Sequence, residues 1–177
     1  MEKSLSRAFI FSFIAVIALN FLFYIIGYSI LGTLDIHFTR ASSHPTYIVL
    51  WFTYPYTYFP WELVIDAMTR DPSIHIGLII MDIGLIASLA VGSIVAAIFG
   101  GDFSNSLGGW LLTSLACIIA ILVIIFVDPF NISWTCHYSG CEIGYTVILV
   151  IIKGLVNLLI FGGITLLTVL VVGSYGK

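Results

Sequence analysis

The chain has 177 residues, of which 60% are hydrophobic and 8% are charged, with a formal net charge of −3. Soluble domains carry about 25% charged residues, because a small globule exposes much surface to water. The composition therefore excludes an ordinary soluble domain, a disordered chain and a protein that binds nucleic acid through basic charge. It predicts an all-α integral membrane protein with a single membrane domain over residues 1–177.

The charged residues are so few that the gaps between them predict the helices. Uncharged stretches run from Arg7 to Asp35, from Asp82 to Asp102, from Asp102 to Asp128 and from Lys153 to Lys177. A helix needs roughly 20 apolar residues to cross a bilayer core about 30 Å thick, and it satisfies its own backbone hydrogen bonds in lipid. We therefore predict a four-transmembrane-helix bundle, with helices at about 8–32, 76–99, 108–127 and 144–172.

The predicted topology places two outer loops, 33–75 and 128–143, on one side of the membrane. The first apolar stretch is longer than the core of a signal peptide, about 7–15 residues, and is predicted to be retained. An even number of helices puts both termini on the opposite side. Cys136 and Cys141 lie in the second loop, and such pairs oxidise outside the cytosol. We expect cytoplasmic termini, in the cell membrane.

Small residues recur at every fourth position on the second predicted helix. Such a pattern lets helix backbones approach closely, and in lipid this close packing replaces the hydrophobic effect. The third helix carries a shorter counterpart. We interpret these residues as a close hairpin of the second and third helices, with docking of a partner helix as the alternative. The helix-packing residues are Gly84, Ser88, Gly92, Ala96 and Gly100, followed by Gly109 and Thr113.

Two charged residues, Asp82 and Lys153, fall inside the predicted helices, where charge is costly and often marks a function or an ion pair. At 1.5 Å per residue both lie roughly 10–14 Å below the loop side, so the two charges can meet at one level. A structural ion pair, a site for protons, ions or a ligand headgroup, and unpaired side chains remain open. The predicted polar cluster consists of Asn20, Tyr24, Tyr28, His75, Asp82, Lys153 and Asn157.

The segment 51–61 of the first loop is rich in aromatic residues. Because Trp and Tyr favour the membrane–water interface, we interpret it as an aromatic anchor, with a docking surface for a partner or ligand as the alternative. Tyr47 to Leu50 is prone to be extended, and Trp61 to Arg70 can form a short interfacial helix with Pro60 at its start. The predicted interface residues are Trp51, Tyr54, Tyr56, Tyr58 and Trp61.

The only sequence that resembles a reactive motif is Cys136-His137-Tyr138-Ser139-Gly140-Cys141. Its spacing is longer than that of the C-x-x-C thiol oxidoreductases, so a structural disulfide is favoured over redox activity, metal binding or free thiols. All four histidines lie in loops or at a helix end. No phosphate loop, zinc-protease motif or nucleophile elbow is present. We therefore predict no metal and no cofactor, and a non-catalytic protein is favoured over an enzyme.

Three functions remain as hypotheses. The first is an accessory or structural subunit of a larger membrane complex, which packs through its small-residue helix faces against other subunits or itself in the lipid bilayer. The second is a small oligomeric transporter or channel protomer that uses the Asp82 and Lys153 cluster. The third is a membrane thiol-redox or quinone-linked enzyme that uses Cys136 and Cys141.

Overall fold

The computed structural model describes residues 3–128 and 142–175, and over these residues the chain is helical, without a strand. The long helices are α1 (Leu5–Ile30), α5 (Pro72–Gly100), α6 (Phe103–Val127) and α8 (Ile143–Tyr175). All four are long and apolar enough to cross a membrane. The prediction of four helices of membrane-spanning length is thus confirmed.

Two of the helices begin earlier than the apolar pattern indicates, because aspartates cap their first turns. Asp71 accepts a backbone hydrogen bond at 2.9 Å, so α5 begins at Pro72 rather than near residue 76. Asp102 accepts one at 2.8 Å, so α6 begins at Phe103 rather than near residue 108. An aspartate at this position satisfies one of the free N–H groups of the first turn. The turn between α5 and α6 therefore shortens to two residues.

Four shorter elements occupy much of the predicted outer loop between α1 and α5. They are α2 (Leu34–Ser43), α3 (Tyr47–Thr53), the 3-10 helix η1 (Tyr54–Thr57) and α4 (Pro60–Thr69). The short helix expected after Pro60 is present, as α4. The prediction of an extended conformation at residues 47–50 is wrong, since these residues begin the helix α3. Tertiary packing of this stretch outweighs its β-propensity. We call α3, η1 and α4, with Arg70, the inserted segment.

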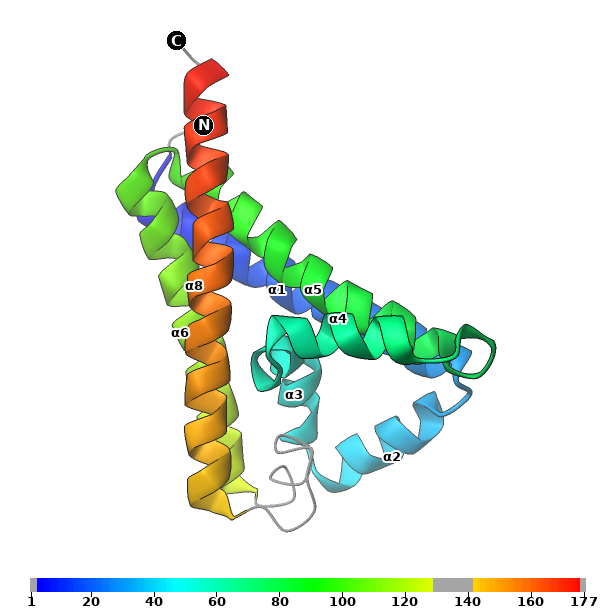
Figure 1. The fold of residues 1–177 in the computed structure, drawn as a ribbon. Coiled ribbons are helices and arrows are strands. Elements are labelled where there is room, and N and C mark those ends of the chain that lie inside the picture. The colour runs from blue at the N-terminus through cyan, green and yellow to red at the C-terminus, as the bar shows by residue number, and fades with distance from the viewer. Residues whose placement is uncertain (1–2, 129–141, 176–177) are drawn as a thin grey trace.

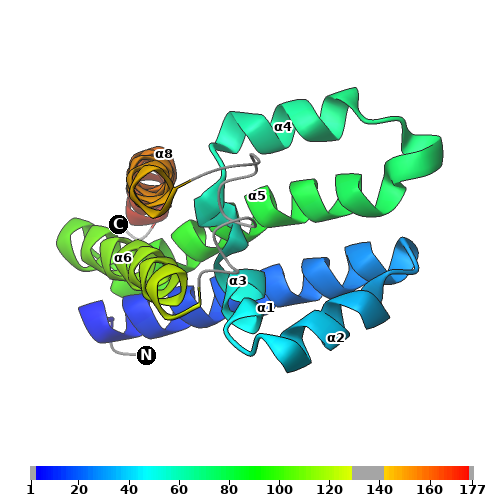
Figure 2. The same ribbon diagram turned by 90° about the horizontal axis from the view of Figure 1, so that it is seen from below.

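The long helices form two pairs arranged as a wedge (Figure 1). The α1–α5 pair and the α6–α8 pair lie close together where α1 begins and α8 ends, which we call the terminal end. They diverge toward the opposite end, which we call the loop end. Seen from the loop end, α2 runs along α1 and α4 runs along α5 (Figure 2). The α3 helix packs against α1 and α6, and η1 packs against α5 and α8, so the inserted segment fills the wedge.

The small-residue face of α5 packs mainly against α1 of the same chain. Contact between these two helices is the most extensive in the structure, and Ser88 and Ala96 on this face are fully buried. The smaller face on α6, with Thr113, also meets α1. Cβ atoms added to Gly84, Gly92 and Gly109 would overlap Phe23, Val16 and Ala8 of α1, respectively.

This packing corrects the expected hairpin interpretation of the α5 face. The face meets α6 at Gly100, where an added Cβ would overlap Ser106, and at Gly92, where an added Cβ would lie 3.3 Å from the Trp110 ring. Along the rest of the face the small residues pack against α1, which is farther from α5 in the sequence than α6 is. The face is therefore not available for a partner helix in this structure.

Gly77→Ala tests the closest backbone approach of α1 and α5. A Cβ at Gly77 would lie 2.5 Å from the carbonyl oxygen of Gly27, which cannot rotate away. Because overpacking costs about 1–3 kcal/mol, we expect a lower melting temperature in mild detergent, measured by circular dichroism. Gly163→Ala in α8 is the matched control, since nothing lies within 4 Å of its added Cβ. Equal melting temperatures of the two variants would contradict this packing.

Candidate functional site

The two buried charges of the long helices, Asp82 and Lys153, each form an ion pair with the inserted segment. Lys153 Nζ of α8 lies 3.1 Å from Glu62 Oε2, and Asp82 Oδ2 of α5 lies 3.3 Å from Arg70 Nε. Both long-helix side chains are nearly inaccessible, 5% and 4% exposed, whereas Glu62 and Arg70 are 34% and 28% exposed. We call these four residues the paired-charge site.

The predicted contact between Asp82 and Lys153 is not formed in the structure. Each residue instead meets a residue of opposite charge on α4 or just after it. Both side chains are buried, and their partners come from a segment that the sequence places at the membrane surface. The Arg70–Asp82 contact is an ion pair by distance, without the alignment of a hydrogen bond.

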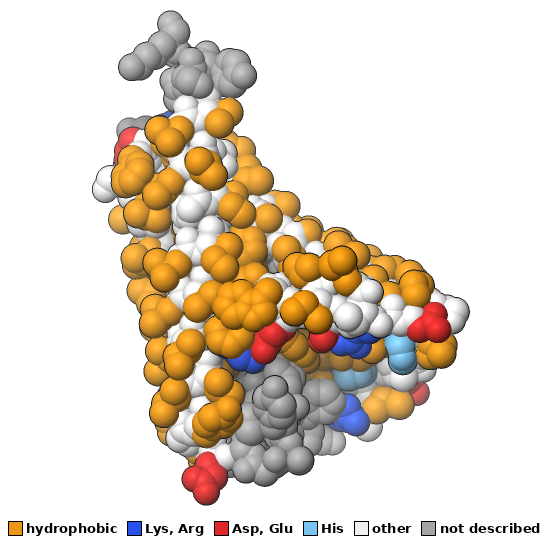
Figure 3. Space-filling model, viewed as in Figure 1, with side chains coloured by type: hydrophobic (Ala, Val, Ile, Leu, Met, Phe, Trp, Pro, Cys, Tyr) orange, Lys and Arg blue, Asp and Glu red, His pale blue; other side chains and the backbone are white. Residues whose placement is uncertain are grey.

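The α4 helix carries its charges on one face because they recur at four-residue spacing. Asp66 accepts a hydrogen bond from Arg70 Nη2 at 3.0 Å, and Glu62 accepts one from the Phe59 N–H at 2.8 Å. The opposite face is apolar and exposed. Acidic and basic side chains gather along one edge of α4, whereas apolar side chains cover its outward side and the long helices (Figure 3). The exposed apolar residues of α4 include Trp61, Val64, Ile65 and Met68.

Near the middle of α1 and α5, polar side chains hold the end of α3. Asn20 donates a hydrogen bond to the carbonyl oxygen of Phe52 at 2.6 Å and accepts a short one from the Ser88 hydroxyl. Asn20 and Ser88 are fully buried. Because the last carbonyls of a helix have no partner within it, the Asn20 amide satisfies a group that would otherwise be buried unpaired.

A matching contact joins η1 to α8 and α6. Asn157 Nδ2 lies 2.9 Å from the carbonyl oxygen of Tyr58 and 3.3 Å from that of Pro55. The Tyr56 hydroxyl lies 3.2 Å from the Ser114 hydroxyl of α6. The inserted segment is therefore hydrogen-bonded to all four long helices, with α5 reached through Ser88.

A hydrogen-bonded chain of aromatic side chains lies nearer the loop end. The Tyr47 hydroxyl lies 3.0 Å from the Tyr24 hydroxyl and 2.9 Å from His37 Nδ1. The Tyr28 ring packs on the imidazole of His37 with centroids 3.6 Å apart. Burial, and then the nearby Arg40 guanidinium, lower the pKa of His37 from 6.5 to about 4, so this imidazole is neutral at pH 7.

The structure divides the predicted polar cluster into three groups. Asn20 and Asn157 bind backbone carbonyls, Asp82 and Lys153 form ion pairs, and Tyr24 and Tyr28 belong to the aromatic chain. His75 joins none of these groups. It lies at a kink in α5, and its side chain makes no hydrogen bond or ion pair with another described residue.

Most of the predicted interface residues are buried inside the protein. Trp51, Tyr54 and Tyr56 are 1%, 7% and 0% exposed, and Tyr58 is partly buried. Only Trp61, at 48% exposure, presents its ring to the surroundings. An aromatic anchor at the surface therefore does not describe this segment, because its rings fill the space between the diverging helices.

The predicted disulfide of Cys136 and Cys141 lies outside the described residues. Cys117, in α6, is a buried free thiol. Within residues 3–128 and 142–175, no group of three or more His, Cys, Asp or Glu side chains could hold a metal ion.

The residues that sequence reasoning missed are the partners supplied by the inserted segment. Glu62 and Arg70 lie in the stretch from Trp61 to Arg70, which the sequence predicts as a short helix at the membrane surface. Their charges are opposite to those of Lys153 and Asp82, and this complementarity was the available signal. His37 and Tyr47 carried no such signal, since hydrogen bonds between loop residues do not follow a sequence period.

Comparisons with protein-family models, with characterised proteins and with solved structures found no match to this chain. The candidate site is therefore interpreted from its geometry alone.

Asn157→Leu tests whether amide donors hold the inserted segment. The substitution leaves the carbonyls of Pro55 and Tyr58 without this donor in a buried place, which costs about 1–3 kcal/mol. We expect a lower melting temperature and faster proteolysis within residues 44–70. Thr168→Val is the control, since the Thr168 hydroxyl bonds only within its own helix. Unchanged proteolysis of Asn157→Leu would show that this amide does not hold η1.

His37→Gln tests the buried imidazole through the pH dependence of stability. The unfolded chain binds a proton at His37 near pH 6.5, whereas the folded protein binds it only near pH 4. The native state should therefore lose stability as pH falls through this window, by on the order of 2–3 kcal/mol. Unfolding free energies measured in detergent between pH 7 and 4 should fall less steeply for the variant. Parallel curves would contradict the assignment.

Proposed function

We propose that the protein is a small membrane transport protomer that binds a charged solute at the paired-charge site. The observation that carries the proposal is that both buried charges of the long helices are neutralised by one short helix. Ionisable residues inside membrane helices are costly and often line solute or ion pathways. Transporters commonly build such sites where helices are interrupted, as α3, η1 and α4 are here.

The proposed placement is a four-transmembrane-helix bundle that crosses the cell membrane, with both termini cytoplasmic and the loop end outside. The inserted segment then enters the bilayer from the outer side, reaches the level of Asn20 and Asn157, and returns to the outer side, where α5 begins. Two observations support this placement. The outward face of α4 is apolar, and Glu62 and Arg70 at its two ends pair with buried charges of the long helices rather than standing alone, as ionisable groups at membrane depth do.

The wedge arrangement of the long helices is consistent with a site that opens toward the loop end. Close contacts at glycines hold α1, α5 and α6 together at the terminal end, whereas the helix pairs diverge toward the loop end (Figure 1). Glu62 and Arg70 belong to the more exposed side of each ion pair. A solute carrying charge could displace one of them and pair with Lys153 or Asp82, without exposing either long-helix charge to lipid.

The accessory-subunit hypothesis stays a prediction, but the small-residue interface expected for it is used within the chain. Its interface was the small-residue face, and Gly84, Ser88 and Gly92 on that face are buried against α1 of the same chain. The thiol-redox hypothesis depends on Cys136 and Cys141, outside the described residues, and stays a prediction. Only the transport hypothesis has gained a specific geometry, in the paired-charge site.

The test is charge movement on a solid-supported membrane carrying reconstituted protein. Protons, Na⁺, K⁺, Cl⁻ and amino acids are added in turn, and we expect a saturable current with at least one of them. The double variant Asp82→Asn/Arg70→Gln removes both partners of a pair, which often leaves stability nearly unchanged. We expect it to melt close to the wild type and to lose the current by about tenfold or more.

The matched control removes a side-chain hydrogen bond outside the site. His44 Nδ1 and Asp128 Oδ2 lie 2.8 Å apart at the loop end, and His44→Gln/Asp128→Asn should keep the current. A current retained by Asp82→Asn/Arg70→Gln would assign that pair a purely structural role. No current from wild-type protein with any of these solutes would overturn the transport proposal.

A further inference from the structure

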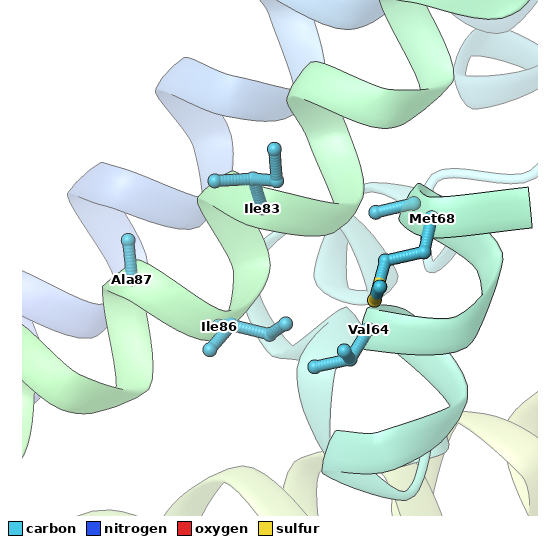
Figure 4. Close-up of a pocket in the computed structure, with 6 residues that line it drawn as sticks. Val64, Met68, Ile83, Ile86 and Ala87 are labelled. Atoms are coloured by element: carbon cyan, nitrogen blue, oxygen red, sulfur yellow. The ribbon is translucent and has the colours of Figure 1, made fainter. Parts of the chain in front are cut away.

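An apolar groove runs between α4 and α5 on the outer surface of the protein. Its volume is about 380 Å³, within the range of roughly 300–1,000 Å³ found for ligand pockets. Val64 and Met68 of α4 face Ile86 of α5 across it (Figure 4). The residues that line it are Val64, Ala67, Met68, Ile83, Ile86 and Ala87.

The groove forms because small side chains line the space between α4 and α5, so that the two helices do not pack closely there. Ala67 on α4 and Ala87 on α5 leave space that larger residues would fill. Leu63, fully buried beside it, makes the close contact instead. Unfilled space of this kind forfeits the dispersion energy of its lining atoms, so an occupant that supplies those contacts stabilises the pairing of α4 with α5.

The chemistry of the lining selects the occupant. Every lining side chain is aliphatic or a thioether, so a water molecule would lack the two or more polar partners that it needs. The groove is continuous with the apolar outer surface of α4 and α5, where Met68 and Ile83 are 80% and 55% exposed. That surface belongs to a helix of membrane-spanning length and meets lipid chains in a bilayer.

We propose that one acyl chain of a bilayer phospholipid occupies the groove and holds α4 against α5. The chain lies between the two helices and contacts both, on the outward side of α4. The inward side of α4 carries Glu62 and Arg70, which pair with Lys153 and Asp82. A bound acyl chain thus favours the position of α4 in which both ion pairs are closed.

The inference rests on the membrane placement and not on transport. It therefore stands or falls separately from the current measured above: lipid binding without any current would leave it intact, and a current without lipid binding would remove it. A protein partner in place of lipid is an outcome that the test distinguishes, because a second chain changes the mass of the complex.

Native mass spectrometry of the full chain in mild detergent, titrated with palmitoyl-oleoyl phosphatidylcholine, tests the proposal. We expect one lipid to be retained by the wild type more tightly than any further ones. Ala67→Leu/Ala87→Leu fills the groove with the protein's own side chains and should weaken this first binding by about tenfold or more. Its melting temperature without lipid should rise toward that of the lipid-bound wild type.

Two further variants complete the design. Ala18→Leu makes the same kind of exchange once, on the exposed side of α1, away from the groove, and should bind lipid as the wild type does. Met68→Gln places an amide at an exposed lining position, where folding does not depend on it, and should weaken the first lipid. Unchanged lipid affinity in both groove variants, or a dimer that they dissociate, would overturn the proposal.

Discussion

The fold depends on hydrogen-bond donors that the long helices offer to interrupted backbone. The inserted segment breaks at η1 and turns again before α4, so the carbonyls of Phe52 and Tyr58 lie where helices end. The Pro55 carbonyl accepts a 3.3 Å hydrogen bond from the Tyr58 N–H and a second one from Asn157. In lipid each unsatisfied backbone group costs several kcal/mol. Asn20 and Asn157 donate to these carbonyls from opposite arms of the wedge, and the two arms can diverge because the segment between them is satisfied from both sides.

The α4 helix is amphipathic in the opposite sense to a helix on a soluble protein. There the apolar stripe faces the core and the charges face water. Here Glu62, Asp66 and Arg70 lie on the side that pairs with the fold, and Trp61 and Met68 point away. This arrangement is stable only if the outward surroundings are apolar. The ion pairs and the acyl groove therefore lie on two faces of the same short helix.

The sequence predicts the features that follow from residue patterns at helical spacing. It does not predict the contacts between helices that are distant in the chain. Charge gaps placed four long helices, and the rise per residue placed Asp82 and Lys153 at a similar depth. The depths of Asp82 and Lys153 in their helices could not predict that α4 lies between these two residues. Aromatic composition was equally compatible with an interfacial belt and with packed rings, and burial of Tyr56 beside Ser114 depends on tertiary contacts that no local pattern encodes.

The polar face of α1 has a consequence for how the protein is made. Ser12 donates to the Gly92 carbonyl, and Asn20 accepts from Ser88, across 80 and 68 residues of sequence. When α1 leaves the ribosome, neither partner has yet been synthesised. The helix must then keep its hydroxyl and amide groups beside the translocon or another protein surface until α5 arrives. Final docking of α1 is therefore a post-insertion step, and its timing is set by translation of the first hundred residues.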